Sequence, residues 1–493
     1  MRRTAQAGTP VGRDPGRAGV TIALYTVIFL IMLPGFLWAL GGRLDALFQW
    51  PRLGRPWRWV GSVFLMAGAL GTVWSMVVLS VRGRGLPISH LAPRRFVREG
   101  PYRFVRHPIY LACVLGFAGA GLVNGSIGRA VCASSFLFAG SVIYSLGFEE
   151  PRLEQRLGKT YRAYRVSVPL FPFPGLGRTL RRAALSAWTA AIPVIDGAAN
   201  RVVLFRLGPT VWATYGALLA LGAAAAAALI GGLMLAGGLS RATTFFYLAS
   251  LTLAAVAVGR LVWLAYQGKE LIRSPLRVLR TIGFVSWGTI AAAMALPFIF
   301  ARFVPHSALW LLDRTLPGLL VAAAIGRLGC LTYGCCFGRP SVHGIRWTNP
   351  DAKLIRQRPE SAGERRVPTQ LIASAWALFA LALVLAATSA PIVDGVVAGL
   401  TLVLYAIGRF GGDCLRDEPR FGAWGLTAGQ IGSAAAGSIG LGLIFAASGP
   451  PAWEVPAWRI DLVSLLALWP AIAVSFAIVF LGCGLHWRRV GRW

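Results

Sequence analysis

Apolar runs long enough to cross a lipid bilayer recur along the whole chain and constrain its fold more than any other feature. A helix of about 20 apolar residues spans the hydrocarbon core, because it satisfies all of its backbone hydrogen bonds internally. The sequence therefore predicts an all-α polytopic membrane protein with about twelve transmembrane helices, four in a first module and eight in a second. The predicted spans lie near 19–40, 58–81, 108–125, 127–147, 210–236, 243–266, 281–301, 308–329, 368–390, 392–410, 425–447 and 461–484.

The composition agrees with a membrane protein. Of the 493 residues, 56% are hydrophobic and 14% are charged, whereas soluble domains carry about 25% charged residues. The formal net charge of +31 comes from 49 Lys+Arg against 18 Asp+Glu. Because the arginines flank apolar runs, we expect them to face anionic lipid headgroups, and we expect no nucleic-acid partner.

A stretch between the two series of runs, near 148–209, is charged and then rich in proline and glycine. It predicts a domain boundary. We expect a membrane domain over 1–180, a linker over 181–202, a second membrane domain over 203–450, and an additional transmembrane helix with a basic tail over 451–493. Residues 183–200 within this stretch are weakly apolar and could dip into or cross the membrane.

Charged residues gather at two membrane boundaries of the first module. The segment "GPYRFVRHPIY" (100–110) begins the third run and carries Arg106 and His107. Its simplest interpretation is a positive-inside anchor with interfacial tyrosines. Glu149 and Glu150 end the fourth run, and adjacent acids at such a boundary cost free energy unless they have partners. The acids therefore favour a binding site over a plain anchor.

These motifs, with "EEPRL" (149–153) and "GKTYRAYRVSVP" (158–169), resemble the isoprenylcysteine carboxyl methyltransferase and phospholipid methyltransferase superfamily over about 20–172. The resemblance implies S-adenosylmethionine at the cytoplasmic membrane boundary, with a methyl acceptor that is either a prenylated cysteine carboxylate or a phospholipid amine. It implies that the arginine and histidine side chains lie near the cofactor carboxylate and that the acids accept from its ammonium and ribose. The implied cofactor-binding residues are Tyr102, Arg103, Arg106, His107, Tyr110, Glu149 and Glu150.

Several charges in the second module lie inside or at the ends of apolar runs. Arg327 stands in "GRLGCLTYGCCFGRP" (326–340), where an arginine could simply extend to the interface. Arg260, Arg409 and Asp413 occupy similar positions. Charges within spans usually face a polar cavity and pair there. Several arginines around one cavity suit a phosphate, which they bind through planar bidentate hydrogen bonds.

The same segment holds Cys330, Cys335 and Cys336, and His343 follows nearby. This set could indicate zinc. However, its spacing matches no strong zinc motif, and adjacent cysteines chelate a single ion poorly. From the sequence we therefore predict no metal.

The second module resembles prolipoprotein diacylglyceryl transferases over about 203–447, through motifs in the family's order. The resemblance implies transfer of a diacylglyceryl group from phosphatidylglycerol to a lipobox cysteine thiol. Its implied catalytic residues are Tyr215, Arg327, Arg409 and Asp413. Its implied substrate-binding residues are Arg260, Gly329, Gly338, Arg339, Gln370, Tyr405, Arg416 and Gln430. The motifs are "LFRLGPTVWATYGALLALG" (204–222), "VGRLVW" (258–263), the 326–340 segment, "VPTQL" (367–371), "LYAIGRFGGDCLRDEP" (404–419) and "LTAGQIGS" (426–433).

The chain departs from the family pattern at four positions. The family usually has asparagine at Cys330, an acid at Cys335 and glutamate at Asp413, and Trp287 stands where the family presents a histidine. A histidine is the natural acceptor for the thiol proton, so a different acceptor substrate stays open.

The side of the membrane also stays open. The charge of loops 331–367 and 411–424 would place them in the cytoplasm by the positive-inside rule, whereas the family acts at the outer face. Phosphate-binding arginines would give the same charge count. A membrane crossing by 183–200 would make both family orientations compatible.

Together these features predict a multi-pass, lipid-modifying transferase of the bacterial inner membrane. Its substrates would be phosphatidylglycerol and a lipoprotein or lipid acceptor. Two alternatives stay open: one half is an inactive scaffold, or the chain is a transporter or lipid-binding protein. The ordered motifs and the lack of an inverted repeat argue against the transporter.

Overall fold

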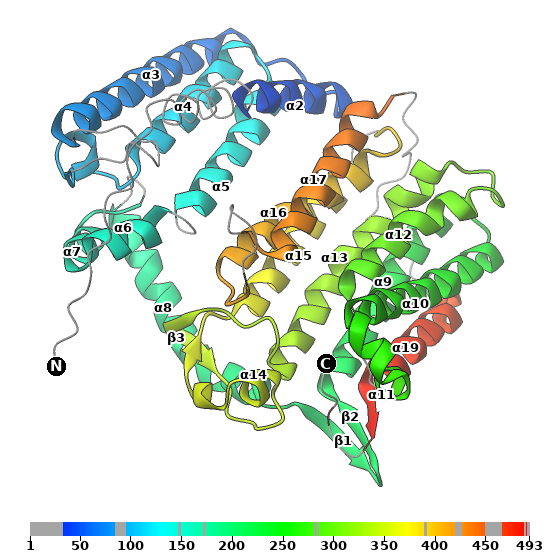
Figure 1. The fold of residues 1–493 in the computed structure, drawn as a ribbon. Helices are drawn as coiled ribbons and strands as arrows, with labels where there is room; N and C mark the ends of the chain where they lie inside the picture. Colours follow the sequence, from blue (N-terminus) through cyan, green and yellow to red (C-terminus); the bar gives the residue numbers. More distant parts are fainter. Residues whose placement is uncertain are drawn as a thin grey trace, which may run out of the picture. The chain divides into compact units, whose positions relative to one another are not determined.

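The computed structural model describes residues 33–83, 95–145, 149–170, 174–280, 283, 285–388, 392–419, 426–448, 466–487 and 490. The chain divides into two compact units, Met1–Thr179 and Leu180–Trp493, and each is built mainly from helices (Figure 1). The helix α8, Pro174–Ala199, contains the boundary between them. Most of the first predicted run, 19–40, lies outside the described residues.

The first unit centres on the helices α3 (Arg55–Gly83) and α4 (Pro108–Val123), which pack along each other. A Cβ added at Gly68 of α3 would overlap the backbone of Gly116 in α4, so the absence of side chains lets the helix backbones approach closely. Pro108 begins α4 directly after His107. The elements are α2 (Leu33–Leu47), α3 (Arg55–Gly83), η3 (Gly100–Arg103), α4 (Pro108–Val123), η4 (Gly128–Ala133), α5 (Ser134–Tyr144), α6 (Glu150–Leu157) and α7 (Lys159–Ser167).

The second unit is a helix bundle around α13, which packs against α9, α12, α15 and α16. A Cβ on Gly216 of α9 would overlap the backbone of Gly484 in α19, so these two helices also touch through glycine. The helices are α9 (Thr214–Ala236), α10 (Arg241–Arg273), α11 (Pro275–Arg280), α12 (Ser286–Phe300), α13 (Ala308–Tyr333), α14 (Lys353–Gln357), α15 (Thr369–Ala387), α16 (Val396–Cys414), α17 (Ala428–Ala446) and α19 (Trp469–Gly484).

Two small antiparallel sheets accompany the bundle. The strands β1 (Val203–Leu207), β2 (Thr210–Ala213) and β5 (Leu485–Trp487) form the first, in the order β1-β2-β5. The strands β3 (Pro340–Arg346) and β4 (Arg365–Arg366) form the second. Because β5 follows α19 and pairs with β2, the chain after 451 contributes to the second unit.

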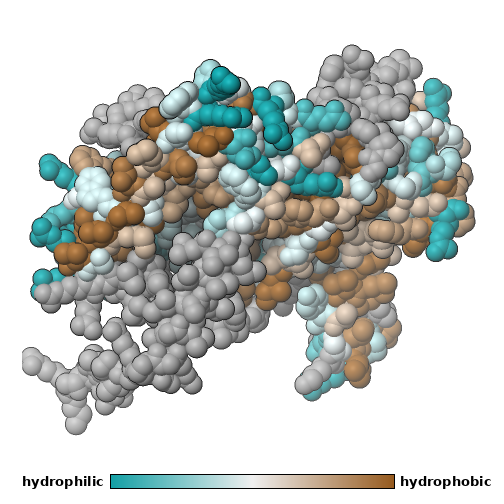
Figure 2. Space-filling view, turned by 90° about the horizontal axis from the view of Figure 1, so that it is seen from above, coloured by the Kyte–Doolittle hydropathy of each residue, from teal (hydrophilic) through white to brown (hydrophobic). Residues whose placement is uncertain are grey.

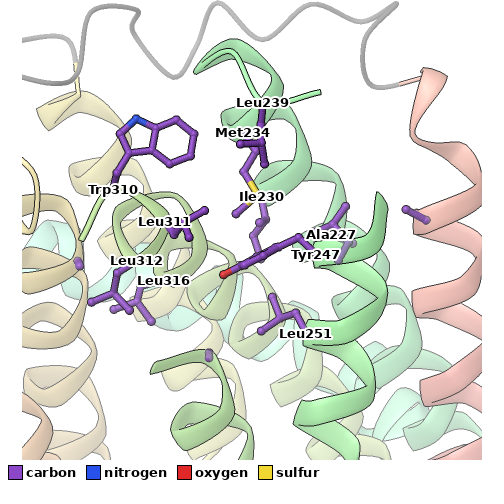
Figure 3. Packing of buried hydrophobic residues seen from close by; sticks show 14 of the residues in the cluster. Ala227, Ile230, Met234, Leu239, Tyr247, Leu251, Trp310, Leu311, Leu312 and Leu316 are labelled. Atoms are coloured by element: carbon purple, nitrogen blue, oxygen red, sulfur yellow. The ribbon is translucent and has the colours of Figure 1, made fainter. Parts of the chain in front are cut away.

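Apolar side chains, most of them from α9, α10 and α13, make a buried core cluster of the second unit, and α12, α16 and α19 also contribute to it (Figure 3). Leu311, Leu312 and Leu316 of α13 are fully buried against residues of α9 and α10. Tyr247 of α10 points among them, and its hydroxyl lies 2.6 Å from the hydroxyl oxygen of Thr315. This hydrogen bond satisfies a buried polar group that would otherwise cost free energy.

The prediction of an all-α polytopic membrane protein is confirmed. Seven described helices are long and apolar enough to cross a membrane: α3, α9, α10, α13, α15, α16 and α17. Shorter apolar helices correspond to four further predicted spans: α4, 128–142, α12 and α19. Hydrophobic residues also cover much of the surface seen in Figure 2, and exposed examples are Val63, Leu70, Leu253 and Leu261. Such a surface suits lipid contact. Helix α8, which includes all but the last residue of 183–200, is not among these candidate spans.

The carboxylate of Asp313 joins α13 to the beginning of α16. It accepts hydrogen bonds from the backbone N–H groups of Gly395, at 2.8 Å, and Ala398, at 2.7 Å. The side chain is buried, and a helix N-terminus favours negative charge because its N–H groups lack partners within the helix. Asp313 therefore fixes α16 against α13.

We expect Asp313→Ala to lower the free energy of unfolding by about 1–3 kcal/mol, because it leaves two buried N–H groups without acceptors. Thermal unfolding in detergent measures the change as a lower midpoint. Asp394→Ala is the matched control, since Asp394 is a neighbouring acid that accepts a hydrogen bond from the Ser307 hydroxyl at 3.0 Å. Equal midpoints for the two variants would show that the cap is unimportant.

Candidate functional site

A cavity of about 830 Å³ lies in the second unit beside α13. Its lining residues on α13 extend from Thr315 to Tyr333, which is a rise of about 27 Å along a helix. Its apolar lining includes Leu219, Ala226, Ile230, Leu248, Leu251, Ile290, Leu319 and Val479. Its polar lining includes Arg327, Cys330, Cys335, Cys336, Lys353, Gln357, Arg358, Asp417 and Glu418. The charged residues belong to the last turns of α13, to α14 and to the loops, so charge gathers at one end of a mostly apolar cavity.

Arg327 lies at the polar end, in contact with a cysteine. Its Nη1 donates to the Sγ of Cys336 at 3.6 Å. Helix α13 ends at Gly334, whose left-handed backbone (φ 71°) turns the chain back. As a result, the Sγ atoms of Cys330, Cys335 and Cys336 all lie within 4.8 Å of one another. The side chain of His343 lies outside the described residues.

Asp413 is the centre of a buried ionic network at the end of α16. Its Oδ1 lies 2.7 Å from Nη1 of Arg409 and 3.2 Å from Nη1 of Arg416. Its Oδ2 accepts from the Thr427 hydroxyl at 2.9 Å. Thr427 and Gln430 form a capping box at the beginning of α17. The structure therefore brings together four of the predicted residues, and it adds Thr427, whose capping position before "AGQ" is the sequence signal.

Three further predicted residues hold the loop after α13 in place. Gln370 is fully buried and donates from Nε2 to the backbone carbonyl of Cys335 at 2.7 Å. The N–H of Arg339 donates to the carbonyl of Leu415 at 3.0 Å. A Cβ at Gly338 would lie only 2.5 Å from a backbone carbonyl oxygen, so this position requires glycine. These contacts position the loop, and none of the three residues lines the cavity.

Tyr215 and Tyr405 line the cavity. Tyr215 lies in the first turn of α9, and its ring centroid lies 5.3 Å from that of Tyr333. A Cβ at Gly329 would lie 3.2 Å from Tyr215, which makes glycine the best fit between α13 and α9. The catalytic candidates Tyr215 and Arg327 thus share one end of the cavity.

Arg260 and Trp287 do not line this cavity. Arg260 donates to the backbone carbonyls of Gly283, at 3.1 Å, and Val278, at 3.4 Å, and it stacks over Trp263. Trp287 packs against α17, where a Cβ at Gly432 would lie 2.5 Å from its ring. Arg260 therefore supports a neighbouring segment, and the Trp287 ring packs against Gly432.

Sequence reasoning missed a charge cluster in the loops at the polar end. Asp417 Oδ2 lies 2.5 Å from Nη1 of Arg358 and 3.0 Å from Nη1 of Arg366. Burial raises the pKa of Asp417, but the hydrogen bonds from both arginines outweigh burial and hold this pKa below its usual range. The charge of the two loops was the only sequence signal, because the pairing depends on how the loops fold.

In the first unit, the structure brings five of the predicted cofactor-binding residues together. Arg106 Nη1 lies 2.6 Å from Glu150 Oε1, and His107 Nε2 lies 3.3 Å from the same oxygen. His107 Nδ1 lies 3.5 Å from Glu149 Oε2, to which the Tyr110 hydroxyl donates at 3.0 Å. Glu150 thus has a cationic partner in Arg106, and Glu149 has hydrogen-bonding partners in His107 and Tyr110.

Tyr102 and Arg103 lie apart from this cluster. Tyr102 is buried, and its hydroxyl donates to the carbonyl of Ser75 at 3.4 Å. Its own carbonyl accepts from the Tyr164 hydroxyl at 2.6 Å. Arg103 is exposed. Tyr102 therefore joins α3 to α7 through hydrogen bonds rather than adding to the charged group.

The charged group suits a zwitterionic ligand by its chemistry, because it offers both carboxylates and cations. Burial raises the pKa of Glu150, but the hydrogen bond with His107 and the charge of Arg106 outweigh burial, so this pKa lies below its usual range. The described cavity beside His107 and Tyr110 is about 20 Å³, which is room for about one water. S-adenosylmethionine would therefore have to replace the internal ion pairs.

Comparison with known proteins separates the two halves. The family described as "Prolipoprotein diacylglyceryl transferase" matches residues 202–446, and the family described as "Phospholipid methyltransferase" matches residues 57–160. The chain is 30% identical over 240 residues to the phosphatidylglycerol–prolipoprotein diacylglyceryl transferase of Dehalococcoides mccartyi. The matched region covers 46% of this chain and 86% of that protein. It is 26% identical over 223 residues to the enzyme of that name from Clostridium tetani. This matched region covers 44% of this chain and 86% of that protein.

A third relative is the phosphatidylglycerol–prolipoprotein diacylglyceryl transferase 2 of Clostridium perfringens. The two chains are 31% identical over 168 residues, which is 33% of this chain and 62% of that protein. The first unit is similar to phospholipid methyltransferases over a shorter stretch. Through its second half, the chain belongs to the prolipoprotein diacylglyceryl transferase family.

Proposed function

We propose that the second unit transfers a diacylglyceryl group from phosphatidylglycerol to the cysteine thiol of a prolipoprotein or a related thiol. The observation that carries this proposal is the cavity along α13, which is apolar over most of its length and charged at one end. Phosphatidylglycerol has the same division between acyl chains and an anionic headgroup. The named relatives support the choice of this lipid.

The reaction forms a carbon–sulfur bond and breaks the bond between the glyceryl carbon and a phosphate oxygen. The electron pair of the broken bond leaves with glycerol phosphate, and the thiol loses its proton. Arg327 lines the cavity at the end where the phosphate would lie. Fixed positive charge at a developing anion lowers the barrier, because the donors need no reorganisation during the reaction.

The remaining predicted residues have different roles in this proposal. Tyr215 and Tyr405 line the cavity and would contact the headgroup. Arg409 and Arg416 are held by Asp413, so they would add positive potential from behind the cavity wall. Asp413 itself is fully buried and already paired, so we assign it a positioning role rather than that of a proton acceptor.

Arg327→Ala should slow diacylglyceryl transfer by about 10²–10³-fold, which corresponds to losing one charge-stabilising donor. Arg327→Lys should recover little of the rate, because an ammonium cannot reproduce the planar guanidinium fork. Release of glycerol phosphate from labelled phosphatidylglycerol, with a lipobox peptide as acceptor, measures the rate. The exposed Arg302 provides the control variant Arg302→Ala. Wild-type turnover by Arg327→Ala would return this arginine to a purely interfacial role.

We propose a second activity for the first unit, the S-adenosylmethionine-dependent methylation of a lipid or lipidated substrate. The match to phospholipid methyltransferases and the group of carboxylates and cations around His107 favour it. The carboxylates of Glu149 and Glu150 would accept from the ammonium and ribose, and Arg106 would then face the cofactor carboxylate. The cofactor supplies the methyl group, and the chain supplies its position.

Glu150→Gln should weaken S-adenosylmethionine binding at least tenfold, about 1.4 kcal/mol, because an amide pairs poorly with an ammonium. Isothermal titration of the detergent-solubilised chain measures this change. Glu154→Gln is the matched control, since Glu154 pairs with Arg162 and Arg165 outside the cluster. Absence of binding at millimolar cofactor by the folded wild-type chain would contradict the methyltransferase proposal.

A further inference from the structure

Three thiols converge at the polar end of the cavity, where they are available to a ligand. The Sγ atoms of Cys330, Cys335 and Cys336 lie within 4.8 Å of one another, and all three residues line the cavity. In a tetrahedral zinc site the sulfur atoms are about 3.8 Å apart, given zinc–sulfur bonds of about 2.3 Å. The thiols would therefore need to approach one another by at most about 1 Å to bind one ion.

Adjacent cysteines chelate a single ion poorly, but the backbone conformation of this segment lets Cys335 and Cys336 do so. Cys336 has a φ of 55°, one of two positive values among the described residues that are not glycine. A left-handed backbone costs free energy for a residue with a side chain and indicates a functional constraint where it occurs. Here it follows the left-handed Gly334, and the two turns bring the neighbouring Cys335 and Cys336 to the same ion position beside Cys330.

The surroundings supply the charge that such a site requires. Three thiolates around a divalent zinc ion carry one net negative charge, which is costly within a membrane protein unless it is paired. Arg327 Nη1 lies 3.6 Å from the Sγ of Cys336, so its guanidinium would neutralise this charge.

We propose that Cys330, Cys335 and Cys336 bind one zinc ion, whose fourth coordination position receives the acceptor thiol of the transfer reaction. This inference rests on the proposed diacylglyceryl transfer. Three protein ligands with one open position are the arrangement of catalytic zinc. Soft thiolates also select copper(I), but the transfer involves no change of oxidation state and needs only a Lewis acid.

The step balances without any further reactant. The acceptor thiol replaces a zinc-bound water and releases its proton to solvent, and zinc holds the resulting thiolate. The sulfur electron pair then forms the bond to the glyceryl carbon, while the carbon–oxygen bond breaks and its electron pair leaves with glycerol phosphate. The thioether product is a weaker ligand than a thiolate, so water displaces it.

The first test measures metal in the full chain, purified in detergent and reconstituted with zinc. Elemental analysis should give one zinc ion for each chain, and competition with a chromophoric chelator gives the affinity. Cys330→Ser, Cys335→Ser and Cys336→Ser should each weaken zinc binding at least about tenfold. Cys113→Ser is the matched control, because Cys113 is a half-buried thiol of the first unit, and it should retain the zinc.

The second test examines the open position with cobalt(II) in place of zinc. A thiolate-to-cobalt charge-transfer absorption should appear in the wild type and disappear in the triple serine variant. A lipobox peptide should change the cobalt d–d bands, and the same peptide with serine at the acceptor position should not. Zinc-free wild-type protein after reconstitution, equal zinc in the triple variant, or a disulfide among the three cysteines by mass spectrometry would each overturn the proposal.

The two proposals can fail separately. Zinc with a peptide-dependent cobalt spectrum, but no diacylglyceryl product, would support the metal site and contradict the proposed transfer. Equal product formation by the wild type and the triple serine variant would support the transfer and overturn the zinc site.

Discussion

The arrangement of the segments near the polar end of the cavity depends on one buried carboxylate. Asp413 has no exposed surface and contacts Arg409, Arg416 and the Thr427 hydroxyl. A buried charge is costly, but removing one partner from such a network costs more, because the remaining charges stay buried without compensation. Since these partners belong to α16, to the loop after it and to the beginning of α17, the carboxylate fixes three segments at once.

A second carboxylate fixes the opposite end of α16. Asp313 of α13 accepts from the N–H groups of Gly395 and Ala398, at the N-terminus of α16. Because α13 also carries Arg327, this contact sets the position of α16 relative to the cavity wall. A site that depends on several charges needs supporting residues of this kind, since small displacements of a charged group reduce its effect on a reacting atom.

The sequence predicted the helices well and the contacts between them poorly. Helices such as α9 and α13 follow from apolar runs, because a bilayer admits few other structures. Motif resemblance also identified Tyr215 and Arg327, which line the cavity. It could not show that Arg260 binds backbone carbonyls away from the cavity, because that depends on how the segment after α10 folds back.

The sequence also could not predict local backbone conformation or the pairing of charged side chains. The spacing of Cys330, Cys335 and Cys336 argued against a shared ligand, yet two left-handed residues bring their sulfur atoms together. Likewise, the sequence predicted that Glu149 and Glu150 need partners, but it did not identify them. The structure gives them Arg106 and His107, which a sequence cannot indicate without the packing of α4 against its neighbours.

The proposed transfer requires activation of the acceptor thiol, and Trp287 stands where the family resemblance places a histidine. A free cysteine has a pKa of about 8.5 and is mostly protonated at neutral pH, whereas the thiolate is the nucleophile. Among the described residues that line the cavity there is no histidine. The carboxylate of Asp417 lies there, but burial is outweighed by Arg366 and Arg358, which hold its pKa low and make it a weak base. A metal ion removes the need for a base, because it favours the thiolate directly. In the proposed transfer, a zinc ion on the three converging thiols would provide the activation that a histidine provides in the family pattern.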